Sequence, residues 1–297
     1  MRALVTGGNG FLGSHLVMAL LERGDSVTVL ESSSSDISRL SEALPHISFY
    51  SLDETGMGRL FDETGGVDIV FHTATSYGRS GESVPQLFET NVIFPLELLN
   101  IASQRKVGFF VNMDTSVHAS LNAYALSKKQ FAQWGEYFAV QKLIGFLNLE
   151  LEHFYGPGDS GSKFTTHVIR SLVANLPEIA LTPGEQKRDF IYIDDAVSAI
   201  LLSADNVRGS SSQVEEDFFR NIPVGSGEAV TIREFAELVQ RITRSGTKLD
   251  FNAIPYRKNE VMFSRADTSA LMEMGWTPAF TLEEGIRKTV EAERGHL

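Results

Sequence analysis

The sequence predicts an α/β protein built on a doubly wound parallel sheet, with a smaller C-terminal lobe. Two observations predict this class. Short apolar runs alternate with longer amphipathic segments through the first half of the chain, and the first apolar run leads into a turn with four glycines, "TGGNGFLG". Strands that alternate with helices favour a parallel sheet covered on both faces. After Gly156 the alternation loosens, and proline, glycine and charged residues become common.

The predicted elements follow in order along the chain. Residues 1–155 are expected to form the sheet domain, with part of the sheet completed by a later segment at about 185–205, and residues 156–297 mainly form the second lobe. Strands are predicted at Arg2–Val5, Ser26–Leu30, Ile47–Ser51, Val67–His72, Gly108–Asn112 and Leu143–Leu149. Helices are predicted at Phe11–Arg23, Gly58–Glu63, Val84–Gln104 with a kink near Pro95, Ala125–Gln141, Thr165–Ala174, Ile193–Ser203 and Ile232–Arg244.

The composition limits the possible partners. The 297 residues are 42% hydrophobic, which suffices for one large domain or one and a half. The net charge of -12 repels phosphate backbones and anionic lipids, so we expect neither nucleic acid nor a membrane as the main partner. The chain has no cysteine, which excludes disulfides and thiolate chemistry, and no metal site is expected. A strand at the very start, without a signal peptide, predicts a cytoplasmic protein.

The glycine turn carries a predicted ligand site. Gly7, Gly10 and Gly13 lie between the first strand and the first helix in a G-x-x-G-x-x-G spacing. Such a turn lets backbone N–H groups reach a pyrophosphate without obstruction by Cβ atoms, and the helix N-terminus adds partial positive charge. This is the cofactor-binding pattern of a Rossmann-type fold. We expect Gly7, Gly10, Phe11, Leu12 and Gly13 to bind NAD(H) or NADP(H).

An acidic residue follows at the distance that a dinucleotide site requires. Glu31 ends the next predicted strand, about 20 residues on, where an acid accepts hydrogen bonds from the adenosine ribose. A carboxylate there repels a 2′-phosphate, which favours NAD(H) slightly over NADP(H). Arg39 and the serines at 32–35 leave a 2′-phosphate pocket open as the alternative. Asp53, after the third strand, is a candidate for binding the adenine amino group or is a solvated loop acid.

A proton-transfer group is predicted in the string "YALSK". Tyr124 and Lys128 lie one helical turn apart, so both face the same side of the helix. A tyrosine ionises at about pH 10, and a neighbouring ammonium lowers its pKa toward the working pH. Thr115 follows a strand at the expected carboxyl edge of the sheet, where its hydroxyl can bind a substrate carbonyl. Tyr-x-x-x-Lys alone occurs by chance, but with Thr115 it indicates hydride transfer at a carbinol carbon.

These motifs resemble those of the extended short-chain dehydrogenases/reductases, in the NAD-dependent epimerase/dehydratase family. The resemblance rests on "TGGNGFLG", "FHTAT", "ETNVIFPLELL", "KRDFIYIDD" and the set Thr115, Tyr124 and Lys128, and it covers nearly the whole chain. It implies that those three residues are catalytic. The residues that it implies in contact with the cofactor are Thr73, Ala74, Asn91, Tyr124 and Lys128.

The resemblance also implies a nucleotide-sugar substrate, bound by the C-terminal lobe. Arg188 and Arg257 stand where relatives grip its pyrophosphate, and guanidinium groups bond phosphate oxygens in pairs. The strings "LEHFYGPGDSGSKF", "NEVMFSRAD" and "MGWTPAF" resemble the CDP-abequose and CDP-paratose synthases, which reduce the 4-keto group of a CDP-3,6-dideoxyhexose. The residues expected to bind the substrate are Thr75, Thr115, His153, Lys163, Phe164, Arg188, Arg257 and Glu260.

Some positions depart from the family pattern. Glu150 stands where many relatives carry an arginine, and His153 replaces an asparagine. The loop of eight residues between Thr115 and Tyr124, which includes His118, is shorter than in many epimerases. Because this loop covers the sugar in relatives, the departure bears on which sugar is bound.

Three functions are compatible with the motifs. The first is a 4-ketoreductase, in which Tyr124 donates the proton, Thr115 orients the carbonyl, and Lys128 lowers the pKa of the tyrosine and holds the nicotinamide ribose. The second is a 4-epimerase that retains NAD⁺, and the third is a cofactor-binding relative without catalysis. A 4,6-dehydratase is disfavoured because Ser116 and Val117 follow Thr115 in place of an Asp-Glu pair.

A homodimer is also expected. The segments Val84–Gln104 and Ala125–Gln141 are amphipathic. The resemblance implies that these two helices of one subunit pair with those of a second copy in a four-helix bundle.

Overall fold

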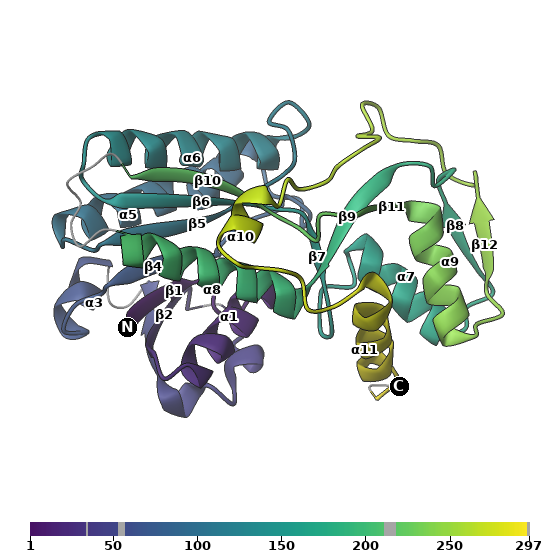
Figure 1. The fold of residues 1–297 in the computed structure, drawn as a ribbon, viewed down its shortest axis with the longest axis horizontal. Coiled ribbons are helices and arrows are strands. Elements are labelled where there is room, and N and C mark those ends of the chain that lie inside the picture. The colour runs from purple at the N-terminus through teal and green to yellow at the C-terminus, as the bar shows by residue number, and fades with distance from the viewer. Residues whose placement is uncertain (34, 53–56, 211–217, 296–297) are drawn as a thin grey trace. The chain divides into compact units, whose positions relative to one another are not determined.

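The fold was obtained as a computed structural model (Figure 1), which describes residues 1–33, 35–52, 57–210 and 218–295. The chain divides into two compact units. The first comprises Met1–Glu150 and Ile200–Ile222, and the second comprises Leu151–Ala199 and Pro223–Leu297. Each unit is therefore assembled from two separate stretches of sequence.

The first unit contains a seven-stranded sheet with the strand order β10-β6-β5-β4-β1-β2-β3. The pairings of β1 with β2 and β4, of β2 with β3, and of β4 with β5 are parallel. Parallel strands bring their carboxyl ends to one edge, so Thr6, Glu31, His72 and Thr115 all lie at that edge. The strands are β1 (Arg2–Thr6), β2 (Ser26–Glu31), β3 (Ile47–Ser51), β4 (Ile69–His72), β5 (Phe109–Thr115), β6 (Gly145–Leu151) and β10 (Phe219–Val224).

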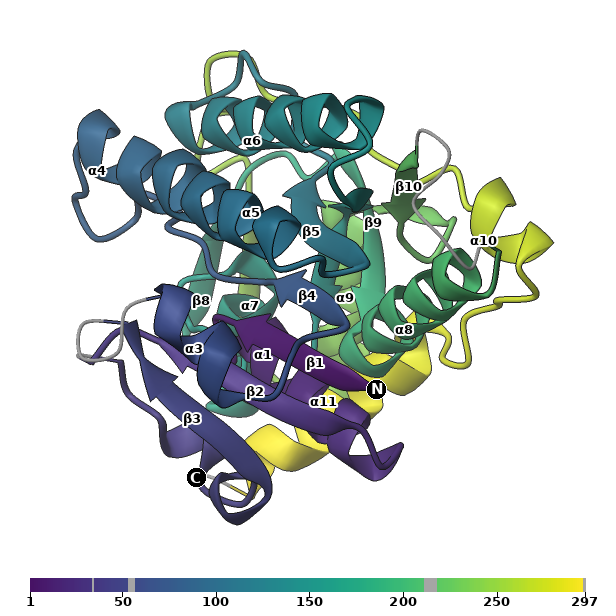
Figure 2. The same cartoon turned by 90° about the vertical axis from the view of Figure 1, so that its left-hand side faces the viewer.

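Helices cover both faces of this sheet (Figure 2). One face carries α3 (Met57–Glu63), α5 (Phe94–Gln104) and α6 (Ala123–Val140), and the other carries α1 (Phe11–Glu22). The core beneath α3, α5 and α6 includes three interlocked rings whose centroids lie 5.6–5.8 Å apart, those of Phe110, Phe131 and Phe146. The doubly wound α/β fold that the sequence predicts is thereby confirmed.

The predicted helix 84–104 is interrupted just before Pro95. The helix α4 (Val84–Phe88) leads into a π-helical turn, η3 (Glu89–Ile93), and α5 begins at Phe94. Single π-helical turns inside helices often occur at functional sites. Here the turn carries Asn91, whose side chain is fully buried.

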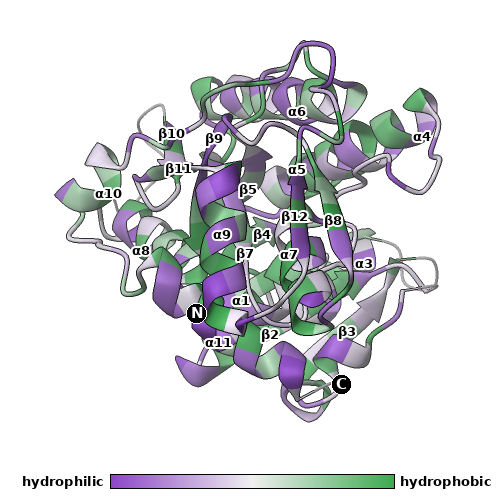
Figure 3. Ribbon diagram, turned by 90° about the vertical axis from the view of Figure 1, so that its right-hand side faces the viewer, coloured by the Kyte–Doolittle hydropathy of each residue, from purple (hydrophilic) through white to green (hydrophobic). Residues whose placement is uncertain are grey.

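The second unit contains two small sheets, with the orders β11-β9-β7 and β12-β8. Its helices α7, α9 and α11 pack against one another, and hydrophilic and hydrophobic stretches alternate along α9 (Figure 3). The strands are β7 (His153–Tyr155), β8 (Glu178–Leu181), β9 (Lys187–Tyr192), β11 (Ala229–Thr231) and β12 (Lys248–Phe251). The helices are α7 (Phe164–Val173), α9 (Ile232–Thr243), α10 (Ser269–Glu273) and α11 (Leu282–Arg294). The helix α8 (Ile193–Ser210) begins in this unit and ends in the first. The short helices η1 (Ser38–Leu40) and η2 (Leu44–His46) belong to the first unit.

One predicted element of the large sheet is wrong. A segment at about 185–205 was expected to complete the sheet, but β10, at 219–224, lies at its edge next to β6. The strand β9, inside the expected segment, pairs with β7 on one side and β11 on the other. Because both edges of β9 are already occupied, it does not extend the large sheet.

Candidate active site

Close approach of the backbone explains the glycines between β1 and α1. Gly7 has a φ of +71°, and a Cβ there would lie 2.5 Å from a backbone nitrogen in the loop after β4. A Cβ on Gly13 would lie 2.0 Å from the carbonyl oxygen of Gly7. Gly10 is the N-cap of α1 and has no side chain with which to cap it. The N–H groups of the first turn, which begins with Phe11 and Leu12, can therefore bind an anion.

The loop after β4 begins with Thr73 and Ala74, two predicted cofactor residues. The Thr73 hydroxyl donates hydrogen bonds to the carbonyl oxygens of Thr6 at 2.7 Å and Gly7 at 3.0 Å. The backbone nitrogen of Ala74 is the atom that Gly7 approaches. The structure thus joins this loop to the glycine turn.

Glu31 lies at the end of β2 and is 7% exposed. Its Oε1 accepts a hydrogen bond from the Asn9 N–H at 2.9 Å, and its Oε2 accepts one from the Ser35 hydroxyl at 3.3 Å. Burial raises the pKa of this carboxyl, and the hydrogen bonds oppose the rise. The structure therefore places Glu31 at the glycine turn, whereas the predicted adenine contact, Asp53, lies outside the described residues.

The three predicted catalytic residues come together where β5 ends and α6 begins. Thr115 is the last residue of β5, and its side chain is hydrogen-bonded to the hydroxyl of Tyr124. Lys128 follows Tyr124 by one turn of α6 and is 1% exposed. The helix starts firmly because the Asn122 side chain caps it and accepts the Ala125 N–H at 2.8 Å. A hydroxyl, a phenol and an ammonium thus lie on adjoining elements.

The protonation of Tyr124 differs from the sequence prediction. Burial raises the pKa of this phenol, Tyr77 and Asp114 raise it further, and the bonded threonine hydroxyl and Arg79 lower it. The predicted net lowering of this pKa is therefore wrong for this structure, because desolvation of the phenolate outweighs the neighbouring charges. Burial also lowers the pKa of Lys128, to about 8, against the attraction of Asp114.

Asn91 braces the site from the π-helical turn. Its Oδ1 accepts from the Ser76 N–H at 2.8 Å and from the Thr75 hydroxyl at 3.2 Å. Its Nδ2 donates to the carbonyl oxygen of Ser76 at 2.8 Å and to the Ser127 hydroxyl at 3.0 Å. The amide thereby uses both donors and accepts twice. Asn91 connects the loop after β4 with α6, close to Tyr124, whose carbonyl accepts from Ser127 at 2.8 Å.

Sequence reasoning missed two residues of the loop after β4. The ring of Tyr77 lies 5.0 Å from that of Tyr124, and the Arg79 guanidinium lies 5.1 Å from the Tyr77 ring. The position of this loop in the sequence could have indicated them, because it begins at the carboxyl end of β4, and ligands of parallel sheets bind at that edge. The His118 side chain, by contrast, bonds within its own turn, where Nδ1 lies 2.8 Å from the Ser120 hydroxyl.

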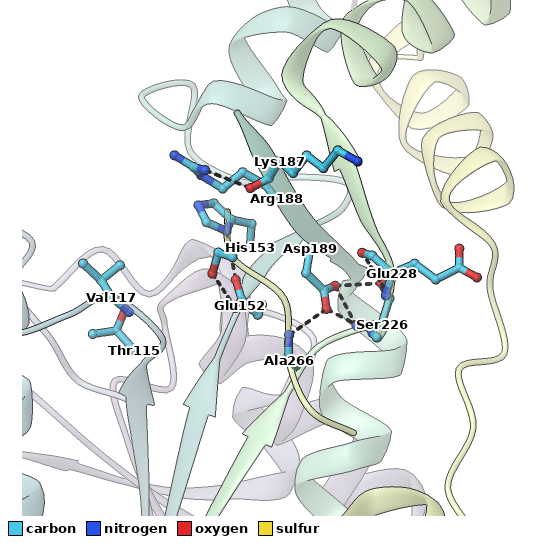
Figure 4. Close-up of polar contacts among 12 residues, drawn as sticks. Thr115, Val117, Glu152, His153, Lys187, Arg188, Asp189, Ser226, Glu228 and Ala266 are labelled. Carbon is cyan, nitrogen blue, oxygen red and sulfur yellow. Dashed lines mark hydrogen bonds and ion pairs between the residues drawn. The ribbon is translucent and has the colours of Figure 1, made fainter. Parts of the chain in front are cut away.

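In the second unit, a predicted substrate arginine is paired with a predicted substrate carboxylate. Arg188, on β9, is 9% exposed; its Nη1 donates to the Lys187 carbonyl at 2.9 Å (Figure 4). Its Nη2 donates to Glu260 Oε1 at 2.6 Å. Burial lowers the pKa of Arg188, and the Glu260 carboxylate raises it. The Glu260 N–H donates to the Arg257 carbonyl at 3.1 Å, and the Arg257 side chain is exposed.

The residue after Arg188 fixes the strand. Asp189 is fully buried and accepts hydrogen bonds from the Ser226 N–H and hydroxyl, at 2.8 and 2.7 Å (Figure 4). It also accepts from the N–H groups of Gly227 at 3.0 Å and Ala266 at 3.2 Å. The aspartate of "KRDF" therefore holds β9 against two loops of its own unit.

The remaining predicted substrate residues lie in the same unit. His153 is on β7, with Nδ1 3.4 Å from Glu152 Oε2. Lys163 is the N-cap of α7, with Nζ 3.1 Å from Asp159 Oδ2, and Phe164 begins that helix. Unlike Arg188, the His153 side chain is well exposed, at 41%.

The described part of the chain contains neither a metal-binding cluster nor a membrane-spanning helix. Within residues 1–33, 35–52, 57–210 and 218–295, no group of three His, Asp or Glu side chains is placed to hold a metal ion. Over the same residues, no helix is long and apolar enough to cross a bilayer.

Comparison with known proteins identifies the family of this chain. The model of the NAD dependent epimerase/dehydratase family matches residues 3–215. The chain belongs to this family. It is 34% identical to the CDP-abequose synthase of Salmonella typhimurium over 97% of each chain. It is 28% identical to the CDP-abequose synthase of Salmonella muenchen, over 97% of this chain and 96% of the relative.

Solved structures of epimerases share the fold over the full chain. The UDP-glucose 4-epimerase of Thermotoga maritima with UDP-glucose has a TM-score of 0.85 and 27% identity, and covers 100% of this chain and 99% of its own. The UDP-glucose 4-epimerase of Thermus thermophilus with NAD has a TM-score of 0.82 and 26% identity, over 100% of both chains. This chain is therefore a nucleotide-sugar-modifying enzyme of the NAD-dependent epimerase/dehydratase family.

The glycine turn of this epimerase/dehydratase fits such a cofactor. Side chains at Gly7 or Gly13 would collide with backbone atoms, so the turn keeps its N–H groups accessible. The start of α1 supplies partial positive charge for a pyrophosphate. Glu31, beside the turn, would offer carboxylate oxygens to a ribose.

Proposed function

We propose that this enzyme reduces the C4 keto group of a CDP-linked 3,6-dideoxyhexose with NAD(P)H. One observation carries the reaction: the buried Tyr124 hydroxyl is hydrogen-bonded by Thr115, and its raised pKa keeps it protonated. A protonated phenol is the form that a reductase needs, because the new alkoxide must receive a proton. The substrate class is supported by the 34% identity to a CDP-abequose synthase over nearly the whole chain.

The residues divide the work as follows. The cofactor, when bound, supplies the hydride for C4 of the sugar. As the C4–H bond forms, the carbonyl electron pair moves to the oxygen, where the Thr115 hydroxyl orients it. Tyr124 gives its proton to that oxygen, the alcohol forms, and solvent restores the phenol. Lys128 is charged below about pH 8 and stabilises the transient tyrosinate.

The substrate-binding roles extend this proposal to the second unit. Arg188 and Arg257 would bind the pyrophosphate, for which a planar guanidinium is suited. Glu260 would orient Arg188, since its carboxylate holds Nη2 at 2.6 Å. The further residues proposed to contact the substrate are Thr75, His153, Lys163 and Phe164.

For the cofactor we propose NAD(H) over NADP(H). The Glu31 carboxylate faces the glycine turn and would repel a 2′-phosphate. Arg39 is the group that favours the opposite choice, because its Nη1 lies 3.4 Å from the Asn9 carbonyl of the same turn. Turnover with equal concentrations of NADH and NADPH decides between them, and faster turnover with NADPH contradicts the proposal.

The decisive experiment supplies 4-keto sugar nucleotides with CDP, UDP, GDP or dTDP to the purified enzyme. Absorbance of the reduced nicotinamide is followed with each substrate. We expect consumption with a CDP-4-keto-3,6-dideoxyhexose and formation of the C4 alcohol. Tyr124→Phe serves as the control for background oxidation of the cofactor.

A 4-epimerase is the second candidate, because UDP-glucose 4-epimerases share the fold at TM-scores of 0.85 and 0.82. An epimerase oxidises and then reduces the same carbon, so it consumes no cofactor. It would purify with NAD⁺ bound and interconvert sugar nucleotides without added nicotinamide. Exchange at C4 without net absorbance change would replace the reductase with this function.

We also propose a homodimer formed through α4 and α6. Both helices expose large apolar side chains, notably Phe88 at 40%, Trp134 at 44% and Tyr137 at 53%. These three line one hollow of the surface, together with Val92, Gln130 and Gln133. Covering such a patch removes apolar area from water, which favours association with a second copy.

A further inference from the structure

A polar cluster behind the catalytic strand has no part in the mechanism above. Lys129 follows the catalytic lysine on α6, Asp114 precedes Thr115 on β5, and Glu150 lies on β6. The Lys129 ammonium lies 2.9 Å from Asp114 Oδ2 and 2.5 Å from Glu150 Oε1. Three elements that meet at the carboxyl edge of the sheet are thus joined by one ammonium.

The same cluster holds both backbone polar groups of Thr115. Lys129 donates to the Thr115 carbonyl at 2.7 Å. Asp114 Oδ1 accepts the Thr115 N–H at 2.7 Å. A residue whose N–H and C=O are both bound to charged groups has little freedom to rotate, because charge-assisted hydrogen bonds are about twice as strong as neutral ones.

The cluster is anchored further into the sheet. Asp114 Oδ2 also accepts from the Asn148 amide at 3.0 Å, and Asn148 donates to Asn221 Oδ1 at 2.7 Å. Asn112 donates to Asn148 Oδ1 at 2.7 Å. The Asp114 side chain is fully buried, while the side chains of Lys129 and Glu150 are about one quarter exposed. The chain of amides ties the cluster to strands β5, β6 and β10.

We propose that Lys129 is a positioning residue that fixes the Thr115 hydroxyl against the catalytic phenol, with Glu150 as its counter-ion. The inference rests on the proposed catalytic role of Thr115. It also gives a reason for Glu150, which stands where many relatives carry an arginine: an arginine there would face the Lys129 ammonium, whereas a carboxylate holds it. A displacement of about 1 Å at a reacting group can cost 10²-fold in rate, so such fixation matters for turnover.

A double-mutant cycle tests whether Lys129 acts through Thr115. We expect Lys129→Gln to lower kcat by about tenfold to a hundredfold and to leave KM for the sugar nucleotide within about twofold. In a Thr115→Ala background the same substitution should change kcat by less than about twofold, because the group that it positions is gone. If the two losses multiply in the double variant, the positioning role is wrong.

Two further variants separate the charge from the fold. Lys129→Arg keeps a cation and should recover most of the lost kcat. Glu150→Gln leaves the contacts of Lys129 with Asp114 and Thr115 in place, so its loss should be smaller than that of Lys129→Gln. Lys142→Gln, which removes an exposed ammonium just beyond the end of α6, should change nothing. Equal kcat in Lys129→Gln and Lys142→Gln contradicts the proposal.

A measurement without substrate keeps this inference apart from the proposed reaction. Amide hydrogen exchange of the peptide that spans the end of β5 reports how firmly Thr115 is held. We expect faster exchange there in Lys129→Gln, slightly faster exchange in Glu150→Gln, and none of this in Lys142→Gln. Wild-type inactivity on every 4-keto sugar would overturn the reductase alone, whereas unchanged exchange in folded Lys129→Gln overturns the positioning role.

Discussion

The ring of Tyr77 lies 5.0 Å from the ring of Tyr124, with the two planes inclined by 37°. The loop after β4 delivers this ring, and Arg79 on the same loop lies 5.1 Å from its centroid. The loop is held in place because Ser76 bonds to the Asn91 side chain through its N–H and carbonyl. The phenol proposed as proton donor therefore has an aromatic neighbour, Tyr77, and a nearby cation, Arg79, that no sequence motif indicated.

Replacing Arg79 should make the proton donor weaker. The positive charge of Arg79 lowers the pKa of Tyr124, against burial and the Asp114 carboxylate, which raise it. Arg79→Gln therefore raises the pKa further and should reduce kcat severalfold at neutral pH, because a weaker acid gives up its proton less readily. The alkaline decline set by Lys128, at about pH 8, should stay in place. Rates measured across pH check both expectations, and Arg79→Lys is the control; a kcat equal to that of the wild type at neutral pH would show that Arg79 has no such role.

Tyr124→Phe should abolish turnover while leaving cofactor binding intact. Loss of a positioned general acid typically costs roughly 10²–10⁴-fold in rate. The cofactor site at the glycine turn is untouched, so the NADH dissociation constant should stay within about twofold by fluorescence titration. Turnover within tenfold of the wild type would mean that another group supplies the proton.

Lys128→Met should stabilise the protein without cofactor at pH 7. Burial lowers the pKa of Lys128 to about 8, so the folded state holds this proton less tightly than the unfolded state does. The cost of burying the ammonium is fully present below pH 8 and disappears as pH rises toward the unfolded value of 10.5. This cost lowers the free energy of unfolding by on the order of 3 kcal/mol.

Thermal unfolding across pH measures this effect. The wild type should gain stability between pH 8 and pH 10.5, where Lys128→Met stays level by comparison. The variant should also lose most of its turnover, since the ammonium no longer stabilises the tyrosinate. A variant that is less stable than the wild type at pH 7 contradicts this account of the buried lysine.

Gly13→Ala should destroy the cofactor site. A Cβ at Gly13 would lie 2.0 Å from the Gly7 carbonyl oxygen, so the turn must shift, at roughly 1–3 kcal/mol of stability. We expect NADH binding to fall below detection in isothermal titration. Gly58→Ala is the matched control, because a Cβ there meets no described atom within 4 Å. Normal binding by Gly13→Ala would show that the turn is not the pyrophosphate site.

The proposed dimer predicts a specific response to charge on α6. Trp134→Glu places a carboxylate in the apolar patch and should give a monomer in sedimentation velocity. Met272→Glu is the control, because Met272 is also a large exposed apolar residue, at 57%, but lies on α10. A monomeric wild type, or a dimer in both variants, removes this interface.

Much of the fold could be predicted because local patterns determine it. The glycine spacing and the acid at Glu31 reflect the backbone geometry of one turn, so both can be recognised within a single stretch of sequence. Thr115, Tyr124 and Lys128 lie on adjoining elements, and their spacing sufficed to group them. The strand at 219–224 was missed because sheet neighbours distant in sequence leave no local signal.

The electrostatics of the site could not be predicted in the same way. The pKa of Tyr124 depends on how much water the folded chain removes, and spacing from Lys128 says nothing about that. The hydrogen bonds of Asn91 to Ser76 and Ser127 could not be predicted either, because they depend on its position on a π-helical turn. Tyr77 and Arg79 lie in a loop whose path is set by that amide.

If Arg188 binds the substrate pyrophosphate as proposed, its ion pair with Glu260 bears on which sugars the enzyme accepts. An arginine whose charge is already balanced offers little to a neutral glycoside or a sugar with one phosphate. A diphosphate carries enough negative charge to share the guanidinium with the Glu260 carboxylate. Of the five N–H groups of Arg188, one donates to Lys187 and one to Glu260, which leaves three for the substrate. Under the proposed function, the ion pair would thus favour a hexose that carries a nucleoside diphosphate over the free sugar.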